Sequence, residues 1–548
     1  MLQPGTRDEL VFLPLGGSGE IGMNFNAYGF GPPSRRKWII LDCGVLFGRE
    51  ASTPGVDIIM PDIRFLAERA EDVLGIIATH AHEDHIGAIA PLWPMLKCPI
   101  YATPFTAVLI EGKLEEAGIT ARVKRIPLRG TLTLGPFRLD FISITHSILE
   151  PNLIAIRTPL GLIAHTGDWK LDPEPMLGEE TDIAAIQKLG DEGVLALVCD
   201  STNALQQGHS GSEAKVRESL TNLIGTLRRR VAVTAFASNA ARLDSIAHAA
   251  KTHGRSIALV GRSMHKIVEA ARATGYLKNF PPVLDAVDAA ELPAAQVLYL
   301  CTGSQGEPRA ALARIAEGNH PDVQLGKGDA VIFSSRIIPG NELPIFELHN
   351  KLSGLGVEVL TELDHFVHVS GHPARDELSE MYRWTRPRIA VPVHGELRHM
   401  SEHARLAKSL QVPEGLVPRN GQLYRLAPGP AELIDEVPSG RIHLDGRVLV
   451  AESEGLSKSR RAMAYAGLIA ITLVLDGKGR AAADPAILIE GIPAPVHEAI
   501  RVAVDDLLCR HKRGDADDLA ESVRRATRRA AHDAWGKKPV TRVTVVEI

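Results

Sequence analysis

The sequence has few cysteines, no long apolar run and no apolar segment at its start. The five cysteines are widely scattered, and no CxxC pair suggests a disulfide or a zinc knuckle. We therefore expect free thiols, buried among mostly apolar neighbours, at Cys43, Cys98, Cys199, Cys301 and Cys509. No stretch of about 18 or more apolar residues occurs, and MLQPGTRDEL lacks the charged start and apolar run of a signal peptide. These absences predict a cytoplasmic protein with no membrane partner.

A strong net charge is also missing. The formal charge of −5 is small for 548 residues and argues against a protein that coats nucleic acid by bulk attraction. A nucleic-acid substrate would have to be held by a local basic groove or by metal ions. With 45% hydrophobic and 23% charged residues, the chain has the composition of a soluble globular protein. It is too long for one ordinary core, so two or three domains are expected.

The pattern of apolar runs changes along the chain. Short strand-like segments with turn signals follow one another through the first 200 residues, with a helical stretch at Phe105–Ala117. From Ser212 helices alternate with strands, which is typical of a mainly parallel sheet. After Gly356 the strand-rich style resumes with VEVLTELD, HVSGH and RIAVPVHGE. The Pro- and Gly-rich segment LAPGPAELIDEVPSGRIHLDG then precedes a C-terminal unit of strands and helices.

The strongest chemical signal is the segment THAHEDH, which directly follows the apolar strand VLGIIAT. Alternating side chains at a strand end let His80 and His82 point the same way. The following turn brings Asp84 and His85 to a neighbouring point. Four potential ligands in six residues are costly to bury without a metal ion. The segment therefore predicts a loop that feeds two adjacent metal ions.

Two adjacent metal ions need more ligands than one loop provides. His146, Asp168 and His394 each lie where an apolar strand opens into a turn, the usual place for site residues in α/β proteins. Taken singly, each of the three is more often structural than ligating. Together with the loop they form a set of seven candidate ligands.

This set resembles the five-motif ligand pattern of the metallo-β-lactamase superfamily. The matching segments are HAHEDH, the histidine at 146, HTGD and the late PVHGE. The resemblance implies two Zn²⁺ ions per chain, with Mn²⁺ or Mg²⁺ as alternatives that accept similar donors. By that resemblance the ligands are His80, His82 and His146 for one ion, Asp84, His85 and His394 for the other, and Asp168 as a bridge between both.

The segment between Asp168 and His394 narrows the resemblance. It spans more than two hundred residues and is similar to the β-CASP domain of nucleic-acid-cutting members of the superfamily. Asp200 of VCDST resembles motif A of that group, His372 of SGH resembles motif B, and His394 is motif C. DNA-directed relatives usually have an apolar residue at motif C, so the histidine favours RNA.

Several strings resemble the ribonuclease J family of β-CASP nucleases: LGGSGEIGMN, PGVDIIMPD, FASN, TGSQGEP, SSRIIPGNE, HVSGH and PVHGE. The resemblance is close over roughly residues 8–450 and rests on position and size beyond them. It implies an α/β protein: a metallo-β-lactamase αββα sandwich with an inserted β-CASP domain and a small α+β C-terminal domain. The predicted boundaries are 1–211 and 356–430 for the two parts of the metallo-β-lactamase domain, 212–355 for the β-CASP domain, 431–455 for a linker and 456–548 for the C-terminal domain.

The resemblance also implies an activity. The expected reaction is two-metal hydrolysis of RNA, 5′-to-3′ from 5′-monophosphorylated ends and also internally, in RNA maturation and decay. His372 is the candidate general acid, with Asp200 to orient or charge it. Asp84 is counted with both the catalytic residues and the ligands. The expected partners are single-stranded RNA, a second copy of the chain in a homodimer, and other RNA-decay proteins.

Polar residues of the insert are candidates for a 5′-phosphate pocket, because their hydroxyl, amide and guanidinium groups suit phosphate oxygens. The loop HVSGH adds groups for the scissile or neighbouring phosphate, and its glycine permits close approach of a ligand. The predicted substrate-binding residues are Ser238, Asn239, Arg336, Asn341, His368, Ser370, Gly371 and His372.

Two other functions compete with this interpretation. A small-molecule metallo-hydrolase of the same fold would explain HAHEDH, but it leaves the large insert, HVSGH and the C-terminal unit unexplained. An RNA-binding scaffold with a decayed site is the non-enzymatic alternative. The complete set of seven candidate ligands opposes it, because decay is expected to remove ligands first.

Overall fold

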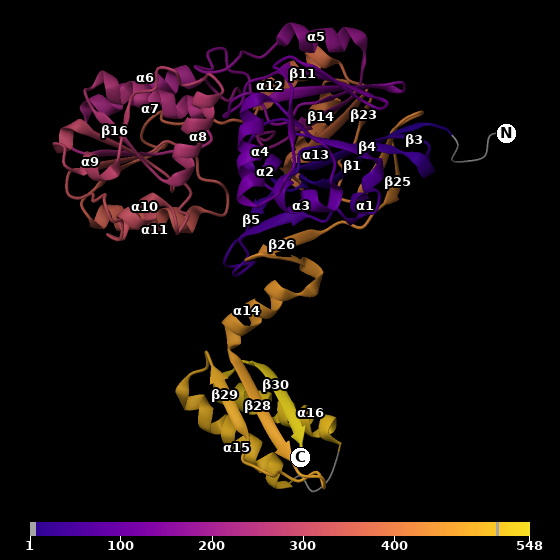
Figure 1. Cartoon of the computed structure of the whole chain (residues 1–548), viewed down its shortest axis with the longest axis vertical. Helices are drawn as coiled ribbons and strands as arrows, with labels where there is room; N and C mark the ends of the chain where they lie inside the picture. Colours follow the sequence, from indigo (N-terminus) through magenta and orange to yellow (C-terminus); the bar gives the residue numbers. More distant parts are fainter. Residues whose placement is uncertain (1–6, 511–514) are drawn as a thin grey trace. The chain divides into compact units, whose positions relative to one another are not determined.

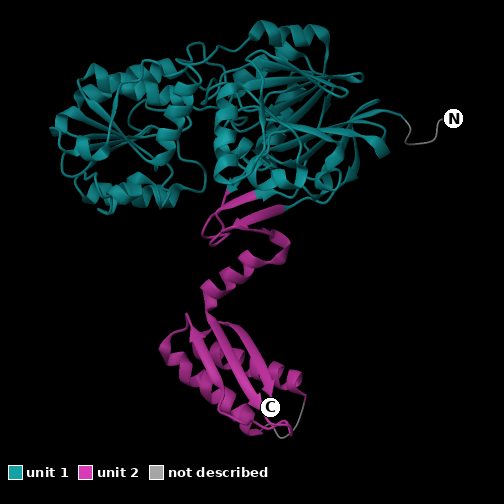
Figure 2. Ribbon diagram, viewed as in Figure 1, with its two compact units in different colours: residues 1–46, 60–440 teal, residues 47–59, 441–548 magenta. Residues whose placement is uncertain are grey.

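The computed structural model describes residues 7–510 and 515–548 (Figure 1). Residues 1–6, at the start of the predicted first domain, and 511–514, in the predicted last domain, lie outside the described residues. The chain divides into two compact units (Figure 2). Unit 1 comprises residues 1–46 and 60–440, and unit 2 comprises residues 47–59 and 441–548. Among the described helices, none is long and apolar enough to cross a membrane.

Two mixed β-sheets pack face to face in unit 1. Their facing sides form one apolar core that includes Phe12, Ile39, Phe141, Ile156 and Val198. A strand that is covered on both faces has a nearly continuous run of apolar residues, as in VLALVCD. In spatial order the first sheet consists of β25 (Glu432–Glu436), β24 (Gln422–Ala427), β1 (Glu9–Gly16), β3 (Phe25–Gly31), β4 (Lys37–Leu41), β7 (Val73–Ile77), β8 (Ile100–Ala102) and β9 (Val123–Arg125). The second consists of β10 (Thr131–Leu134), β11 (Phe137–Ser143), β12 (Asn152–Thr158), β13 (Gly161–His165), β14 (Val194–Asp200), β21 (Ile389–Val393) and β23 (Glu414–Gly415).

Helices cover the outer faces of these sheets. A second apolar cluster joins Leu153 and Leu197 of the second sheet to Ile186, Leu378 and Leu406 of three helices. Those helices are α5 (Ile183–Glu192), α12 (Arg375–Thr385) and α13 (Leu397–Ser409). The helices that accompany the first sheet are α1 (Arg64–Ala67), α2 (Glu83–Ile86), α3 (Ile89–Leu96) and α4 (Pro104–Glu116). The short strand β2 (Ser18–Gly19) pairs with β22 (Gly395–Glu396). Two further short strands, β5 (Leu46–Phe47) and β6 (Ile58–Pro61), lie at the two ends of the segment 47–59 that belongs to unit 2. The predicted αββα sandwich is confirmed.

Parallel pairing in the second sheet gathers polar residues at one edge. β13, β14 and β21 run parallel, with His165 opposite Val198 and Asp200 opposite Val393. The carboxyl ends of these strands therefore meet, and ligands of α/β proteins bind in the crevice outside such ends. Because of this register, three segments lie side by side: the loop that follows β13, the end of β14 and the residue that follows β21.

The insert forms a third, all-parallel sheet with its own core, which includes Tyr299, Leu312 and Phe333. Figure 1 shows helices over both of its faces. Its strands in spatial order are β17 (Val283–Leu284), β16 (Ser256–Val260), β18 (Val297–Cys301), β15 (Val231–Thr234), β19 (Ala330–Phe333) and β20 (Glu358–Leu360). Its helices are α6 (Glu213–Thr226), α7 (Ala240–Thr252), α8 (Arg262–Ala273), α9 (Ala286–Ala290), α10 (Ala311–Ala316) and α11 (Glu342–Gly354). The sheet extends past the boundary predicted at 355, because β20 pairs with β19.

Unit 2 contains a hairpin and a small α+β domain. Residues 431–455, predicted as a linker, include strand β25 of unit 1 and the hairpin β26 (Arg441–Asp445) and β27 (Val448–Ala451). The remaining elements are α14 (Leu456–Ala466), β28 (Leu468–Leu475), β29 (Ala486–Glu490), α15 (Ala494–Arg510), α16 (Ala516–Trp535) and β30 (Val540–Glu547). The domain boundaries as a whole stay a prediction.

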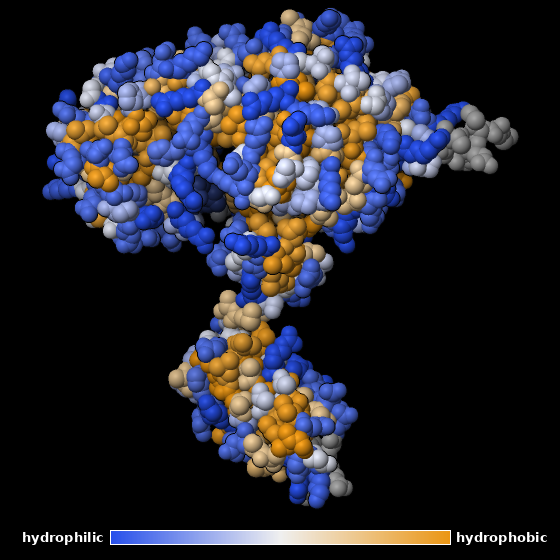
Figure 3. Space-filling model, in the orientation of Figure 1, coloured by the Kyte–Doolittle hydropathy of each residue, from blue (hydrophilic) through white to orange (hydrophobic). Residues whose placement is uncertain are grey.

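One face of the sheet β29-β28-β30 packs on α15 and α16 through a core that includes Ile471, Ile500 and Val523. Its other face is open, and Figure 3 shows apolar residues there. Leu488 and Val546 on the strands are 52% and 42% exposed. All five cysteines are free as expected, but Cys509 at the end of α15 is exposed, so its predicted burial is wrong.

Candidate active site

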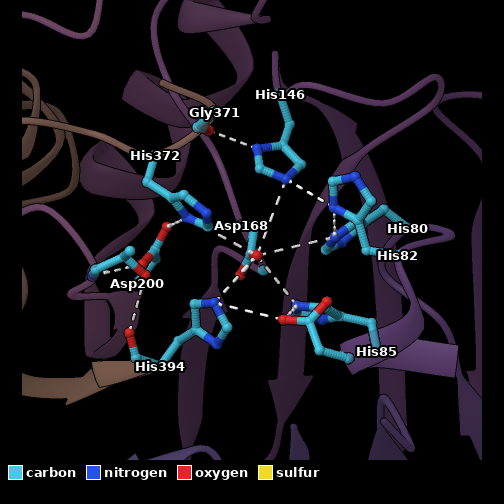
Figure 4. A network of polar contacts seen from close by, with 12 residues as sticks. His80, His82, His85, His146, Asp168, Asp200, Gly371, His372 and His394 are labelled. Carbon is cyan, nitrogen blue, oxygen red and sulfur yellow. Dashed lines mark hydrogen bonds and ion pairs between the residues drawn. The ribbon is translucent and has the colours of Figure 1, made fainter. Parts of the chain in front are cut away.

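The seven candidate ligands meet at the carboxyl edge of the strands in unit 1 (Figure 4). They form two groups that share Asp168, and within each group the ligand atoms lie within 4.8 Å of one another. β7 ends at Ile77, so His80 and His82 lie in the loop before α2 rather than on the strand itself. The alternation expected along a strand is therefore not what turns them toward the same point. One group is His80, His82, His146 and Asp168, and the other is Asp84, His85, His394 and Asp168.

The first group places ring nitrogens against one another. Nδ1 of His82 lies 3.1 Å from Nε2 of His80 and 3.0 Å from Nε2 of His146. The far nitrogens are already engaged: His80 Nδ1 lies 3.0 Å from the Thr79 hydroxyl, and His146 Nδ1 donates to the Gly371 carbonyl. Burial lowers the pKa of all three rings, to about 4 for His82. Neutral rings that donate outward turn their lone pairs inward, an arrangement that favours a bound cation.

The second group centres on the Asp168 carboxylate. Its Oδ2 lies 3.1 Å from Nε2 of His85 and 3.3 Å from Nε2 of His394. Asp84 Oδ2 lies 3.7 Å from Nε2 of His394. Asp168 Oδ1 is buried and has no hydrogen-bond partner among the described residues. A buried carboxylate oxygen without a partner is costly, so a cation beside it fits the donor set. Asp168 reaches both groups, as a bridging ligand must.

A buried carboxylate that sequence analysis missed orients His85. Asp42 Oδ2 accepts hydrogen bonds from His85 Nδ1 at 2.7 Å and from the Thr79 hydroxyl at 2.9 Å. Its Oδ1 accepts from the Thr79 backbone at 2.8 Å. Such carboxylate–histidine pairs fix the ring that holds a metal ion. The sequence does offer one sign of this role, because Asp42 in LDCG stands directly after the buried strand β4. Its positive φ of 65° also marks a position that the site constrains.

Asn24 does the same for His394. Its Oδ1 lies 2.9 Å from His394 Nδ1, and its Nδ2 donates to the Asp84 carbonyl at 3.1 Å. The asparagine oxygen can only accept, so His394 Nδ1 carries the proton and Nε2 is left for a metal ion. Asn24 belongs to the string LGGSGEIGMN, but nothing in the sequence assigns it to His394, which lies 370 residues away.

We expect Asp42→Asn to weaken metal binding by about 10- to 100-fold. The asparagine amide can place an N–H group opposite the N–H group of His85 Nδ1. Two hydrogen-bond donors repel each other, so the His85 ring that faces Asp168 would be displaced. Titration of chelator-treated protein with Zn²⁺ measures the effect. Asp72→Asn, at a surface ion pair with Lys37, is the control. Equal affinities in the two variants would remove Asp42 from the metal site.

His372 lies beside the two metal groups and pairs with Asp200. Their Nδ1 and Oδ2 atoms are 2.8 Å apart, and His372 Nδ1 lies 3.8 Å from Asp168 Oδ2. Burial lowers the pKa of His372, but the charge and hydrogen bond of Asp200, together with the charges of Asp168 and Asp84, outweigh burial and raise the pKa to about 9. The Thr202 backbone N–H donates to the other Asp200 oxygen at 2.8 Å. The geometry therefore favours a protonated imidazole at neutral pH.

The segment HVSGH, expected in a strand-rich region, is a loop. Asn203, which sequence analysis did not single out, donates to Ser370 Oγ at 2.7 Å and to the His372 carbonyl at 3.0 Å. A Cβ on Gly371 would lie 2.6 Å from Ser147 Oγ and 2.8 Å from His146 Cε1. Glycine is needed there because the backbone must approach His146 closely enough to accept its Nδ1 proton.

The predicted phosphate ligands do not share one environment. Ser238 Oγ lies 3.1 Å from His82 Nε2, directly beside the first metal group. Asn239 is buried at the start of α7, where its oxygen accepts from the Arg242 backbone and its amide donates to Glu213. Arg336 is about half exposed and lies 3.6 Å from Glu362. Asn341 at the start of α11 donates to Gln305. The phosphate roles of these residues stay predictions.

Comparison with known proteins supports the same assignment. Four family models match: metallo-beta-lactamase superfamily over 30–232, ribonuclease J beta-CASP domain over 228–352, Zn-dependent metallo-hydrolase RNA specificity domain over 356–413, and ribonuclease J C-terminal domain over 457–548. Ribonuclease J of Sinorhizobium meliloti is 45% identical over 99% of this chain and 98% of its own. Ribonuclease J of Thermus thermophilus is 40% identical over 86% and 83%.

A crystal structure of an Enterococcus faecalis protein of unknown function matches with a TM-score of 0.51 and 14% identity. It covers 76% of this chain and 99% of that one, and this likeness concerns the fold alone. Fold, domain order and sequence together define the class: a metal-dependent ribonuclease built on a metallo-β-lactamase domain with a β-CASP insert. The chain belongs to the ribonuclease J family. The expected RNA substrate and the use of divalent metal ions agree with this membership, which does not support the small-molecule alternative.

Proposed function

We propose that the chain hydrolyses RNA by a two-metal mechanism, both 5′-to-3′ from 5′-monophosphorylated ends and internally, in RNA maturation and decay. The observation that carries the proposal is the pair of four-residue groups that share Asp168. One ion would be held by His80, His82 and His146, and the other by Asp84, His85 and His394. Imidazole and carboxylate donors favour Zn²⁺, with Mn²⁺ or Mg²⁺ as alternatives.

Two divalent ions in these groups would supply the positive charge that acidifies a water and neutralises the phosphate oxygens. The protein's own residues supply the proton transfer at the other side of the scissile bond. His372, protonated and held by Asp200, donates its proton to the leaving 3′-oxygen as that oxygen gains charge. Asp200 keeps the proton on the ring until then. Gly371 and Asn203 hold the loop so that the imidazole faces the shared carboxylate.

His368 of this loop and the nearby Arg336 support the 5′-phosphate role. His368 Nδ1 is buried and has no hydrogen-bond partner among the described residues. Burial lowers the pKa of His368 well below its usual value, and the positive charges of Arg242, Arg336 and Lys170 lower it further. Arg242 and Lys170 are buried and already paired with Glu213 and Asp172. Among these three, Arg336 is the most exposed, and its guanidinium can bind phosphate oxygens as a fork.

We expect fast release of mononucleotides from RNA with a 5′-monophosphate, and slower release from the same RNA with a 5′-triphosphate or 5′-hydroxyl. A triphosphate is too bulky for such a pocket, and a hydroxyl lacks the charge. Ser238→Ala combined with Arg336→Ala should remove the preference. End-labelled RNAs of identical sequence, compared in single-turnover assays, measure it. Internal cutting should persist in this variant, because it needs no terminal phosphate.

Arg398→Ala is a matched control, since Arg398 lies at the surface, where it pairs with Glu396. Equal rates on all three ends, with only internal fragments, would exclude the 5′-phosphate pocket and leave an endonuclease. Loss of all cleavage in the double variant would instead place Ser238 at the metal group through its contact with His82.

The partners follow the same proposal. We propose a homodimer, supported by the open sheet face of the C-terminal domain with its exposed Leu488 and Val546. Apolar surface on an open sheet is typical of an interaction site. Contacts with other RNA-decay proteins and the cytoplasmic location stay predictions from the sequence.

A further inference from the structure

A buried ion pair lies in the insert, and neither of its members is a candidate metal ligand. Arg242 on α7 is 1% exposed, and Glu213 at the start of α6 is 3% exposed. The guanidinium donates from Nε to Glu213 Oε2 at 3.0 Å and from Nη2 to Oε1 at 2.8 Å. Replacing a buried pair of this kind with well-packed apolar residues is often neutral or stabilising. Stability alone therefore does not explain why the chain buries two charges here.

The third nitrogen of Arg242, Nη1, reaches the start of the loop that carries His372. Nη1 donates to the Ser334 carbonyl at 2.9 Å, to the Ser334 hydroxyl at 2.8 Å and to the Val367 carbonyl at 3.1 Å. The Ser334 hydroxyl donates to the same Val367 carbonyl at 2.7 Å. Val367 directly precedes HVSGH, the loop that carries His368 and His372. One buried side chain thus holds the start of this loop.

Glu213 connects the pair to the loop that carries Asp168. Its backbone N–H donates to Asp172 Oδ2 at 2.9 Å. The same carboxylate oxygen lies 2.9 Å from Nζ of Lys170, which is 1% exposed. Lys170 and Asp172 follow Asp168 by two and four residues. A continuous path of buried charges therefore joins the loop of the bridging carboxylate to the loop of the general acid.

We propose that Arg242 is a positioning residue for RNA cleavage, which through Glu213 and Val367 sets the His372 loop against the Asp168 loop. The inference rests on the proposed function, because it assigns Arg242 to the general acid. Arginine is needed since its planar fork bonds a carboxylate and two carbonyls at once, whereas lysine offers one compact ammonium. A displacement of the loop by about 1 Å can lower the rate about 100-fold even though Arg242 touches no substrate.

The test compares Arg242→Lys and the pair Arg242→Met with Glu213→Leu, each as the full chain. We expect the paired variant to melt close to the native protein, because no buried charge is left alone. Its single-turnover cleavage rate should nevertheless be about 10- to 100-fold lower, with unchanged RNA affinity. Arg242→Lys should keep the charge and show the same loss of rate. Native rates in a folded paired variant, or in Arg242→Lys, would overturn the proposal.

A matched control lies on the same helices. Arg217 of α6 pairs with Asp244 and donates to Ser245, both on α7, and among the described residues it makes no hydrogen bond to the loop that carries His372. Arg217→Met should therefore leave the rate unchanged. If Arg217→Met lowers the rate as much as Arg242→Lys, general loosening of the insert explains the effect and the proposal is wrong.

A double-mutant cycle that combines Arg242→Lys with His372→Ala separates this inference from the proposed function. If Arg242 acts by placing His372, then Arg242→Lys combined with His372→Ala should be no slower than His372→Ala alone. Additive losses would overturn the positioning role while leaving the general acid intact. If His372→Ala by itself leaves the rate unchanged, the proposed function fails first, and the positioning role fails with it.

Discussion

Asp168→Asn is expected to lose at least one of two bound metal ions and to cleave RNA roughly 1,000-fold more slowly or worse, since metal ions supply several kcal/mol of charge stabilisation in the transition state. Asp168 is the one residue shared by both ligand groups, and its carboxylate lies near 3 Å from His85 and His394. Asparagine keeps the shape but removes the charge and one acceptor, so neither group retains its anionic ligand at that position.

Metal content measured by elemental analysis after purification without chelator checks the first part, and single-turnover cleavage of labelled RNA checks the second. Asp191→Asn is the matched control, because that carboxylate is 78% exposed and pairs with Arg386 at the surface. EDTA should abolish cleavage by the native protein, and added Zn²⁺ or Mn²⁺ should restore it. Native protein without bound metal and with full activity in EDTA would contradict the two-metal proposal.

His372→Ala is expected to slow the single-turnover step by about 100- to 10,000-fold, the usual contribution of general acid–base catalysis. RNA affinity should change little, because the leaving oxygen needs the proton only as it gains charge in the transition state. Binding and cleavage are measured separately, with binding determined in the absence of metal. His209→Ala is the control, since that ring is 56% exposed near Asp376. Collapse of RNA affinity with an unchanged cleavage rate would make His372 a binding residue.

The pH dependence follows from the same pair. Asp200 is the largest of the influences that raise the pKa of His372 to about 9, and the general acid works only while it is protonated. Cleavage should therefore fall as the pH rises through that pKa. Asp200→Asn removes the raising charge, so the pKa of His372 drops and the alkaline fall begins at lower pH. An alkaline limb at the same pH in both proteins would separate Asp200 from the ionisation of His372.

Much of the ligand set could be predicted because each member stands in a short pattern. HAHEDH follows an apolar strand, and the other three ligands follow strands whose apolar runs are plain in the sequence. The residues that hold those ligands could not be found in this way. Asp42 meets His85 across 43 residues, and Asn24 meets His394 across 370. The sequence around a single polar residue in a turn does not indicate which distant residue it will contact.

Asn239 shows the converse limit. FASN resembles a family string, and the chemistry of an amide suits a phosphate as well as a helix start. The structure uses that amide to cap α7 and to hold Glu213, while its neighbour Ser238 contacts His82. Composition could not separate these uses, because they differ only in which atoms the folded chain brings within about 3 Å of the amide.

Local spacing in the sequence predicted an α/β protein, a helix–strand segment in its middle and seven candidate ligands, because apolar runs have strand or helix length and histidines and carboxylates stand where the runs end. The αββα class and the β-CASP character of the insert came from the resemblance of its motifs to the metallo-β-lactamase superfamily. The tertiary structure decided which nitrogen of each histidine faces inward, where Asp42 and Asn24 act, and how Arg242 reaches the His372 loop. Those features depend on contacts between segments far apart in the chain. Parallel pairing of β13, β14 and β21 and the folding of the insert against Val367 create them only once the whole unit has formed.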